Sequence, residues 1–456
     1  MFVGRSEEKK AIIKRIDRSN LEFGILYGRR RIGKTTLLKN ILEERRGIYF
    51  VASEMDLSYN LEAFSRVVAN YFNEPISFAS LEMIFAYLKK KSERERLFVV
   101  IDEFTYLFVR EKGIESMLQN ILDHVINEAN MTLILSGSQV GMIEDVLSYK
   151  RPLYGRLTFK IKLEDFDYFD ASSFYPNYSN EDKVIAYSIF GGIPHYLARI
   201  SDRLTIKENV INLLSGKNAD FKDEIDFFLK QELRSISVYG MIISAIASGA
   251  TKLNEIAQSA LIKETGTASK YIDTLRDLNI VEKEVCFGEK INSKRTIYKI
   301  KDNFFNFYYF FIHKNKSQIA LMDDNYFYDA FIVPSLSTYV GNKFETIAKQ
   351  FLIKKNKMNK VDPFFEIARY WGNNKDLKRE VEIDLVTKGK NALVVYECKW
   401  TNDLFRLAEV KSFKQNASHL RPTSYQAFSK SGYSDDARKA LDKAYIIDDL
   451  YSLQIK

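Results

Sequence analysis

The stretch that decides the fold of the first part of the chain is LEFGILYGRRRIGKTTLLKN, which spans residues 21–40. Residues 21–27 form an apolar run typical of a buried strand. Next comes the loop Gly28-Arg29-Arg30-Arg31-Ile32-Gly33-Lys34-Thr35, and residues 36–42 after it have the apolar spacing of a helix. A strand, a G-x-x-x-x-G-K-T loop and a helix in this order are the context that a phosphate-binding loop requires.

The residue types of this loop predict an ATP site. Its glycines let backbone N–H groups wrap around a phosphate, and the helix that starts there points its positive end at the same anion. Lys34 can reach the β- and γ-phosphates, and the hydroxyl of Thr35 can ligate Mg²⁺. We therefore expect the loop to bind ATP and Mg²⁺ through the following residues: Gly28, Arg29, Arg30, Arg31, Ile32, Gly33, Lys34, Thr35 and Thr36. The three arginines could instead form a solvated basic edge, or contact DNA or a partner.

Two acidic residues follow a second buried strand further along the chain. Residues 97–101 are LFVVI, and Asp102 and Glu103 come directly after them. Beside a phosphate loop, Asp102 is expected to hold the Mg²⁺ shell and Glu103 to polarise the attacking water. Glu103 and Lys34 are therefore predicted catalytic residues, with solvated acids at a strand end as the alternative.

Two polar residues downstream are further candidates for the same site. Ser138 follows a strand predicted over residues 133–135 and could read the γ-phosphate; an ordinary polar turn is the alternative. Arg156 could supply positive charge to the transition state, a role that a neighbouring subunit often fills. The alternative is a plain surface arginine. A homo-oligomer is therefore a possible assembly.

Alternating strands and helices predict the architecture of the first third of the chain. Strands are predicted over residues 21–27, 47–52, 97–101 and 131–135, with helices over 61–72 and 115–127. This order is typical of a mostly parallel sheet that helices cover on both faces.

The pattern becomes helical after about residue 170, and from 236 to 300 it predicts a winged helix. Three short helices are predicted over 239–246, 252–259 and 265–278, and a hairpin over 281–287 and 295–300. The third helix and the hairpin carry basic side chains that suit contacts to DNA phosphates: Lys270, Arg276, Lys283, Lys290, Lys294 and Arg295.

Acidic residues alternate with apolar ones near the end of the chain. Residues 381–385, VEIDL, place Asp384 and Glu382 on one face of a strand, and residues 393–399, LVVYECK, do the same for Glu397 and Lys399. If these strands are neighbours, Asp384 and Glu397 can bind Mg²⁺ or Mn²⁺, with Glu345 of the preceding helix as a third ligand. Lys399 can orient the water or stabilise charge, so Asp384, Glu397 and Lys399 are predicted catalytic residues. A solvated polar face is the alternative.

Composition limits the classes of protein that fit. The net charge of +8 and the pI near 9.0 suit a polyanionic partner such as DNA, although many proteins carry such an excess without binding nucleic acid. Cys286 and Cys398 are far apart, which favours a reducing compartment over a disulfide framework. We see no signal peptide, and the most apolar run, 304–312, is too short to span a bilayer. A cytoplasmic protein without a membrane partner is expected.

Several motifs along residues 1–235 resemble the archaeal-type ATPases of the STAND/AAA+ group. They are FVGR at 2–5 with Glu7, YGRRR at 27–31, DE at 102–103, GS at 137–138, YGR at 154–156 and GGIP at 191–194. The resemblance implies that Val3, Gly4 and Arg5 lie near the adenine. It also implies that Pro194, in a helical lid, closes over the nucleotide. In this group a winged helix often packs on the ATPase as a switch and binds no DNA.

The last part of the chain, residues 335–456, resembles the PD-(D/E)XK nuclease superfamily. The predicted order of elements is α-β-β-β-α-β, and the strings EID at 382–384 and ECKW at 397–400 match the domain of unknown function that follows many archaeal-type ATPases. The proline that usually precedes the aspartate is absent, and Ile383 stands there. The resemblance implies a metal-dependent nuclease ancestry.

The predicted fold class is therefore a multidomain α/β protein. We expect a P-loop ATPase core over residues 1–170, a helical lid over 171–235, a winged helix over 236–300, a linker helix over 301–334, and a restriction-endonuclease-like α/β domain over 335–456. Two functions fit this organisation. One is an ATP-regulated, metal-dependent DNA-processing nuclease, and the other is a nucleotide-switched regulator or scaffold whose last domain binds nucleic acid without cleaving it.

Overall fold

The computed structural model describes residues 2–111, 113–290, 293–374 and 376–453. The chain divides into two units, Met1–Asp165 and Phe166–Lys456, each with a sheet of its own. In the described residues, no helix combines the length and the apolar character needed to cross a membrane.

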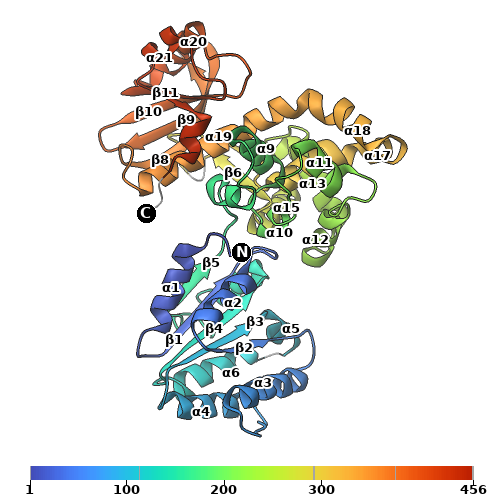
Figure 1. Ribbon diagram of the computed structural model, residues 1–456, viewed down its shortest axis with the longest axis vertical. Helices are drawn as coiled ribbons and strands as arrows, with labels where there is room; N and C mark the ends of the chain where they lie inside the picture. Colours follow the sequence, from blue (N-terminus) through green and yellow to red (C-terminus); the bar gives the residue numbers. More distant parts are fainter. Residues whose placement is uncertain (1, 112, 291–292, 375, 454–456) are drawn as a thin grey trace. The chain divides into compact units, whose positions relative to one another are not determined.

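The first unit is built on a five-stranded parallel sheet with strand order β2-β3-β4-β1-β5 (Figure 1). Its strands are β1 Glu22–Tyr27, β2 Ile48–Val51, β3 Leu97–Asp102, β4 Met131–Gly137 and β5 Phe159–Lys162. Its helical segments are α1 Ser6–Ile16, α2 Lys34–Glu44, α3 Leu57–Phe72, α4 Leu81–Ser92, α5 Thr105–Arg110, α6 Ile114–Asn120, η1 Ile121–Val125 and α7 Val140–Val146. Every residue of the three central strands β3, β4 and β1 is buried, as expected of a parallel sheet covered on both faces.

The strand order gathers the motif-bearing loops at one edge of this sheet. β4 lies between β3 and β1, and all three strands run in the same direction. The loops that follow them therefore leave from the same, carboxyl edge of the sheet, which is where open α/β sheets bind ligands. The four strands predicted from the sequence are all present. The edge strand β5 was not predicted, because it has no buried position and two of its four residues are lysines.

The second unit begins with helices. They are α8 Tyr168–Ala171, η2 Ser172–Phe174, α9 Asn180–Phe190, α10 Pro194–Leu197, α11 Ile206–Val210, η3 Ile211–Ser215 and α12 Glu224–Glu232. Three helices and an antiparallel hairpin follow in the predicted order: α13 Ile236–Ala247, α14 Leu253–Ser259, α15 Thr265–Asp277, β6 Val281–Val285 and β7 Thr296–Ile300.

The segment predicted as one linker helix consists of several short helical pieces instead. They are α16 Asn303–Phe307, η4 Tyr308–Ile312, η5 His313–Asn315, α17 Lys316–Leu321, α18 Asp324–Phe327 and η6 Tyr328–Ile332. Their aromatic start is core, since Phe304, Phe305 and Phe307 are fully buried. The amide of Asn303 also donates to the carbonyl oxygen of Tyr187 in α9, at 2.9 Å. The segment is therefore part of the folded unit and does not span between domains as a free helix.

A second sheet closes the chain, with strand order β12-β11-β10-β9-β8. The long helix α19 Val333–Lys357 precedes it and packs on β9 and β10. The elements are β8 Phe364–Asn374, β9 Arg379–Gly389, β10 Leu393–Lys399, α20 Leu407–Ala417, η7 Ser418–Leu420, β11 Ser424–Ser429, α21 Asp435–Ala440, β12 Lys443–Ile446 and α22 Ile447–Tyr451. β8, β9 and β10 are antiparallel neighbours, whereas β10, β11 and β12 run parallel. The predicted α-β-β-β-α-β order is present from α19 to β11, and α21, β12 and α22 follow it.

Candidate nucleotide site and carboxylate cluster

The phosphate loop has a backbone that requires its two glycines. Gly28 and Gly33 have φ angles of 155° and 92°, and Gly33 is the residue before α2 begins. A Cβ atom on Gly28 would lie 2.6 Å from the carbonyl oxygen of Leu163, so a larger residue there would displace the loop. Glycine is needed at these positions because the loop turns sharply between β1 and α2, and because it passes close to the segment after β5.

Lys34 lies inside the loop and reaches its carbonyl groups. Its Nζ donates to the carbonyl oxygens of Gly28, at 2.9 Å, and Arg29, at 3.2 Å, and the residue is 5% exposed. The ammonium group is therefore held at the centre of the loop, where the motif requires a cation for the phosphates.

Asp102, the last residue of β3, is hydrogen-bonded to the first turn of α2, directly after the phosphate loop. The hydroxyl of Thr35 donates to Oδ2 of Asp102 at 2.9 Å, and the backbone N–H of Glu103 donates to Oδ1 at 3.0 Å. The residue is 1% exposed. Thr35 and Asp102, predicted to hold the same Mg²⁺ from two sides, are thus direct neighbours.

Glu103 lies at the same edge in a left-handed conformation, with φ of 51°. Ser138, which follows β4, donates its hydroxyl proton to Oε2 of Glu103 at 3.0 Å. Ser138 is therefore placed to orient the predicted base, Glu103. The sequence had suggested a contact of Ser138 with the γ-phosphate and not this one.

Tyr49 is a residue of this site that sequence reasoning missed. Its phenol on β2 donates to Oδ2 of Asp102 at 2.5 Å, and burial together with this carboxylate raises the pKa of Tyr49. Tyr49 precedes no short motif. Tyr49 could be identified only from the pairing of its strand, β2, with β3, the strand of Asp102. This pairing is visible only in the folded sheet.

The chain start lies against the phosphate loop. Arg5 donates from Nη2 to the carbonyl oxygen of Ile32 at 3.2 Å and pairs with Glu8 at the same distance. Val3 and Gly4, predicted near the adenine, immediately precede Arg5 in this segment. Of the loop arginines, Arg29 is only 4% exposed, so the solvated edge is wrong for this residue, whereas a contact to DNA or a partner stays a prediction.

Arg156 lies at the other end of the sheet. Its guanidinium donates to both carboxylate oxygens of Asp123, at 2.8 and 2.7 Å, and this hydrogen bonding lowers the pKa of Asp123. Thr158, two residues on, donates its backbone N–H to Phe23 near the amino end of β1. The phosphate loop follows the carboxyl end of that strand, roughly 15 Å away at about 3.3 Å per residue. Arg156 therefore does not meet the phosphate loop of its own first unit.

Pro194, the predicted lid residue, begins α10 in the second unit. The phosphate loop belongs to the first unit, so the closing of Pro194 over the nucleotide stays a prediction.

The second unit brings the predicted C-terminal residues together. β9 and β10 pair antiparallel up to Leu385 opposite Tyr396, which places Asp384 beside the next pair position, that of Glu397. The backbone N–H of Cys398 donates to Oδ2 of Asp384 at 2.7 Å. Lys399 forms an ion pair with Glu397 at 2.9 Å.

Burial makes this a costly place for negative charge. It raises the pKa of Glu345, on α19, to about 8, and the charge of Asp384 is the second cause. It also raises the pKa of Glu397 to about 7, again with Asp384 as the second cause, and it raises the pKa of Asp384. Carboxylates that burial penalises in this way are stabilised by a nearby cation. We call Glu345, Asp384, Glu397 and Lys399 the carboxylate cluster.

Arg369 is a second residue that the sequence did not reveal. It lies on β8, and its guanidinium forms ion pairs with Glu345, at 3.7 Å, and with Glu382. No motif includes it, because its position opposite β9 comes from strand pairing with a register shift between Ala368 and Tyr370. In the described ranges, no three His, Cys, Asp or Glu side chains have a ready-made metal-binding arrangement.

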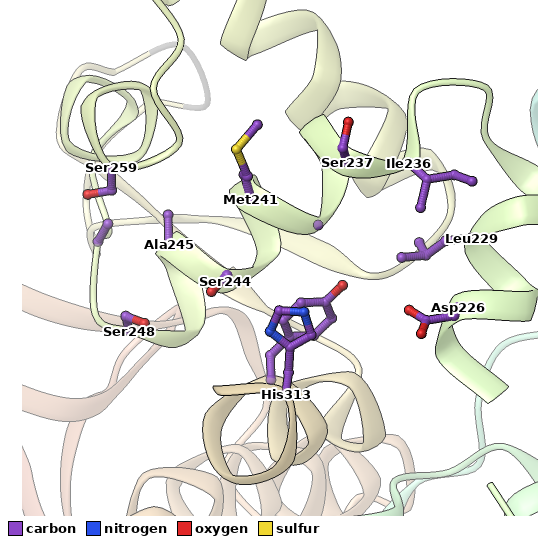
Figure 2. A pocket seen from close by; sticks show the side chains of 13 residues that line it. Asp226, Leu229, Ile236, Ser237, Met241, Ser244, Ala245, Ser248, Ser259 and His313 are labelled. Carbon is purple, nitrogen blue, oxygen red and sulfur yellow. The ribbon is translucent and has the colours of Figure 1, made fainter. Parts of the chain in front are cut away.

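The second unit contains a cavity of about 530 Å³ (Figure 2). Asp226 of α12, Ser244 of α13 and the stacked rings of Tyr309 and His313 line it, with ring centroids 4.7 Å apart. None of the residues predicted from the sequence is among the described residues that line it. The arrangement does not identify a ligand.

Comparisons with known proteins agree with the first unit's geometry. Residues 2–200 match the family described as an ATPase domain predominantly from Archaea, and residues 308–415 match a family of archaeal and bacterial proteins of unknown function. An uncharacterised protein of Methanocaldococcus jannaschii is 35% identical over 407 residues, which cover 88% of each chain. An uncharacterised ATP-binding protein of the same organism is 44% identical over 46 residues, 10% of this chain and 78% of that protein. A Walker-type ATPase of Pyrococcus abyssi has a TM-score of 0.47 at 22% identity, covering 67% of this chain and 95% of that one.

The parallel sheet, the G-x-x-x-x-G-K-T loop and the facing Asp102 define a P-loop ATPase. Residues 2–200 form an archaeal-type ATPase domain, and the whole chain belongs to one family with its M. jannaschii relative.

Proposed function

We propose that this ATPase is an ATP-regulated, metal-dependent nuclease that processes DNA. The observation that supports this most is the meeting of Asp384, Glu397 and Lys399 with Glu345 on one α-β-β-β-α-β unit. Two carboxylates and a lysine at this spacing suit metal-assisted hydrolysis of a phosphodiester, in which the lysine orients water or stabilises developing charge.

At the nucleotide site, we assign each of the predicted residues one role in the binding or hydrolysis of ATP. Lys34 binds the β- and γ-phosphates, and Thr35 with Asp102 holds Mg²⁺. Glu103, oriented by Ser138, accepts the proton of the attacking water. A bound Mg²⁺ would neutralise charge on the phosphates.

The carboxylate cluster fits a divalent cation. Four carboxylates meet there, Glu382 included, against the two cations Arg369 and Lys399. Lys299 adds further positive charge near Glu345, so the fit depends on the carboxylate oxygens themselves, which are ligands that Mg²⁺ and Mn²⁺ prefer. The raised pKa values of Glu345 and Glu397 point the same way, because a cation would favour their charged forms.

Coupling between ATP and DNA is proposed to run through the second unit. In this proposal residues 171–235 are the lid that carries Pro194, residues 236–300 are a winged helix, and residues 335–456 are the nuclease-like domain. Residues 1–170 are the ATPase core and 301–334 the linker. ATP binding would rearrange the lid and winged helix, and DNA would bind the second unit. Arg156 would act on a neighbouring copy in a homo-oligomer, since it lies far from the loop of its own chain.

The test is cleavage of plasmid and branched DNA by the purified full chain with Mg²⁺ or Mn²⁺. Wild type, Asp384→Ala and Lys34→Ala are compared. We expect nicking by wild type, none by Asp384→Ala, and loss of ATP dependence in Lys34→Ala. Cleavage that persists undiminished in Asp384→Ala would assign it to a contaminant.

A second function, a nucleotide-switched regulator that binds but does not cleave, is supported by a specific observation. Among described residues no ready three-ligand metal arrangement exists, and Arg369 and Lys399 already pair with cluster carboxylates. DNA binding without cleavage on every substrate and metal would favour this alternative.

A further inference from the structure

The hairpin formed by β6 and β7 is fixed to the edge strand of the C-terminal sheet. The backbone N–H of Phe287, just after β6, donates to the carbonyl oxygen of Arg369 on β8 at 2.8 Å. Cys286 donates its thiol proton to the carbonyl oxygen of Trp371 at 3.3 Å. The ring of Phe287 is 9% exposed and belongs to the hydrophobic core of that sheet. The segment after β6 therefore lies along the edge strand β8 and is hydrogen-bonded to the backbone of Arg369 and Trp371.

The side chain of Arg369 points the other way, into the carboxylate cluster. Its guanidinium lies between Glu345 and Glu382, and the side chain is 18% exposed. Its Nε is buried and contacts the carboxylate of Glu382, but this contact does not have the orientation of a hydrogen bond. A guanidinium has five donors in a planar fork that matches phosphate oxygens. The charge of Arg369 is thus paired with two carboxylates, while its Nε donor makes no well-oriented hydrogen bond.

We propose that Arg369 is the nucleic-acid phosphate-binding residue of the carboxylate cluster, and that a divalent metal replaces its charge there. The metal would neutralise Glu345 and Asp384, and the guanidinium would turn its donors to a phosphate of the nucleic acid. Phe287 would keep the backbone of Arg369 in place during this exchange. The inference rests on the proposed nuclease-like function and names how its substrate is held.

In the variant Arg369→Gln, we expect Mn²⁺ binding to become tighter and Mn²⁺-stimulated DNA binding to be lost. Removing the competing cation by Arg369→Gln tightens Mn²⁺ binding by roughly tenfold, because a buried like charge close to the metal is lost. The same variant loses the stimulation of DNA binding by Mn²⁺ that wild type shows. Arg369→Lys keeps the charge without the fork, so its Mn²⁺ affinity stays near wild type while its DNA binding is weakened.

The experiment uses the full chain without nucleotide. Calorimetry measures Mn²⁺ binding, and fluorescence anisotropy measures binding of a short duplex DNA with and without Mn²⁺. Lys299→Gln is the charge-matched control. Lys299 lies on β7, pairs with Glu284 at 2.7 Å and adds positive charge near Glu345 without lying between the carboxylates. We expect this control to retain Mn²⁺-stimulated DNA binding.

The outcomes separate this inference from the proposed function. If wild type binds Mn²⁺ no better than Asp384→Ala, the proposed metal site fails and the inference fails with it. If wild type binds Mn²⁺ at the cluster but Arg369→Gln weakens that binding, or still shows Mn²⁺-stimulated DNA binding, Arg369 is structural and only the inference fails. Circular dichroism of each variant checks that the fold is retained.

Discussion

At the scale of single residues, the carboxylate of Asp102 explains how the nucleotide site is organised. It accepts three hydrogen bonds, from the hydroxyl of Thr35, the phenol of Tyr49 and the backbone N–H of Glu103. These donors come from α2, β2 and the end of β3, so the carboxylate is fixed from three directions. A carboxylate held in this way has its orientation set before any ligand arrives, which is the usual requirement for an efficient site.

Tyr49→Phe tests this organisation. The change removes one hydrogen bond to a buried charged group, which is worth about 1.5–3 kcal/mol. We expect the Mg²⁺ concentration for half-maximal ATPase activity to rise by roughly tenfold, whereas ADP binding in EDTA changes little. Steady-state ATPase assays across a Mg²⁺ series measure the first effect, and calorimetry measures the second.

Tyr87→Phe is the matched control for that prediction. Tyr87 donates to Oε2 of Glu74 at 2.6 Å, a similar phenol–carboxylate bond in the same unit, but far from the phosphate loop. The Mg²⁺ dependence of Tyr87→Phe should equal that of wild type. A similar shift in both variants would show that loss of packing, and not the bond to Asp102, is the cause.

At the scale of elements, the hairpin of β6 and β7 makes contacts within the second unit that its basic residues did not reveal. Val281 and Ile300 are buried on the face toward the helices α13 and α15. The segment after β6 is bound to β8 through Phe287, and Arg295 donates to the carbonyl oxygen of Trp371 on that strand. Arg295, predicted as a phosphate contact, is thus engaged within the protein.

Phe287→Ala measures how strongly the hairpin is attached. Phe287 lies in the core of the C-terminal sheet, and truncation of a buried phenylalanine costs about 3–5 kcal/mol. We expect the urea midpoint of the second unit to fall accordingly, as followed by tryptophan fluorescence, because Trp371 and Trp400 both lie in that unit. Phe365→Ala serves as control. This residue lies on β8 but is 72% exposed, so its loss should cost less than about 0.5 kcal/mol. Equal effects would mean that Phe287 is not an anchor.

At the scale of the whole molecule, Arg156 bears on assembly. It is paired with Asp123 at the amino end of the first sheet, while the phosphate loop lies at the carboxyl end. If it takes part in hydrolysis, it must act on the loop of another copy. Oligomerisation would then be a condition of ATPase activity.

A complementation experiment tests that condition. Arg156→Ala and Lys34→Ala should each hydrolyse ATP poorly, because one lacks the supplied arginine and the other the phosphate lysine. Mixed together, they should regain measurable activity, since a subunit with an intact Lys34 can then meet a neighbour with an intact Arg156. Arg45→Ala, which breaks the ion pair with Asp17 in the same unit, should remain active alone. No recovery on mixing would exclude action on a neighbour.

The sequence by itself determined the nucleotide site and the order of elements around it. The loop from Gly28 to Thr35 is contiguous, and its chemistry depends on backbone conformation that glycine, lysine and threonine specify locally. The apolar run before Asp102 likewise marked a buried strand with an acid at its end. In the last domain, the alternation around Asp384 and Glu397 placed both acids on one face of their strands, because side chains in a strand have a period of two.

Only the tertiary structure decided which distant side chains complete these sites. Tyr49 reaches Asp102 because β2 pairs with β3, and Arg369 reaches Glu345 because the edge strand β8 pairs with β9 beneath α19. The distance of Arg156 from its own phosphate loop also follows from the direction of β1. Pairing between strands that are far apart in sequence leaves no local pattern, since it is set by burial of whole faces and by register, and a single residue's neighbours along the chain do not encode it.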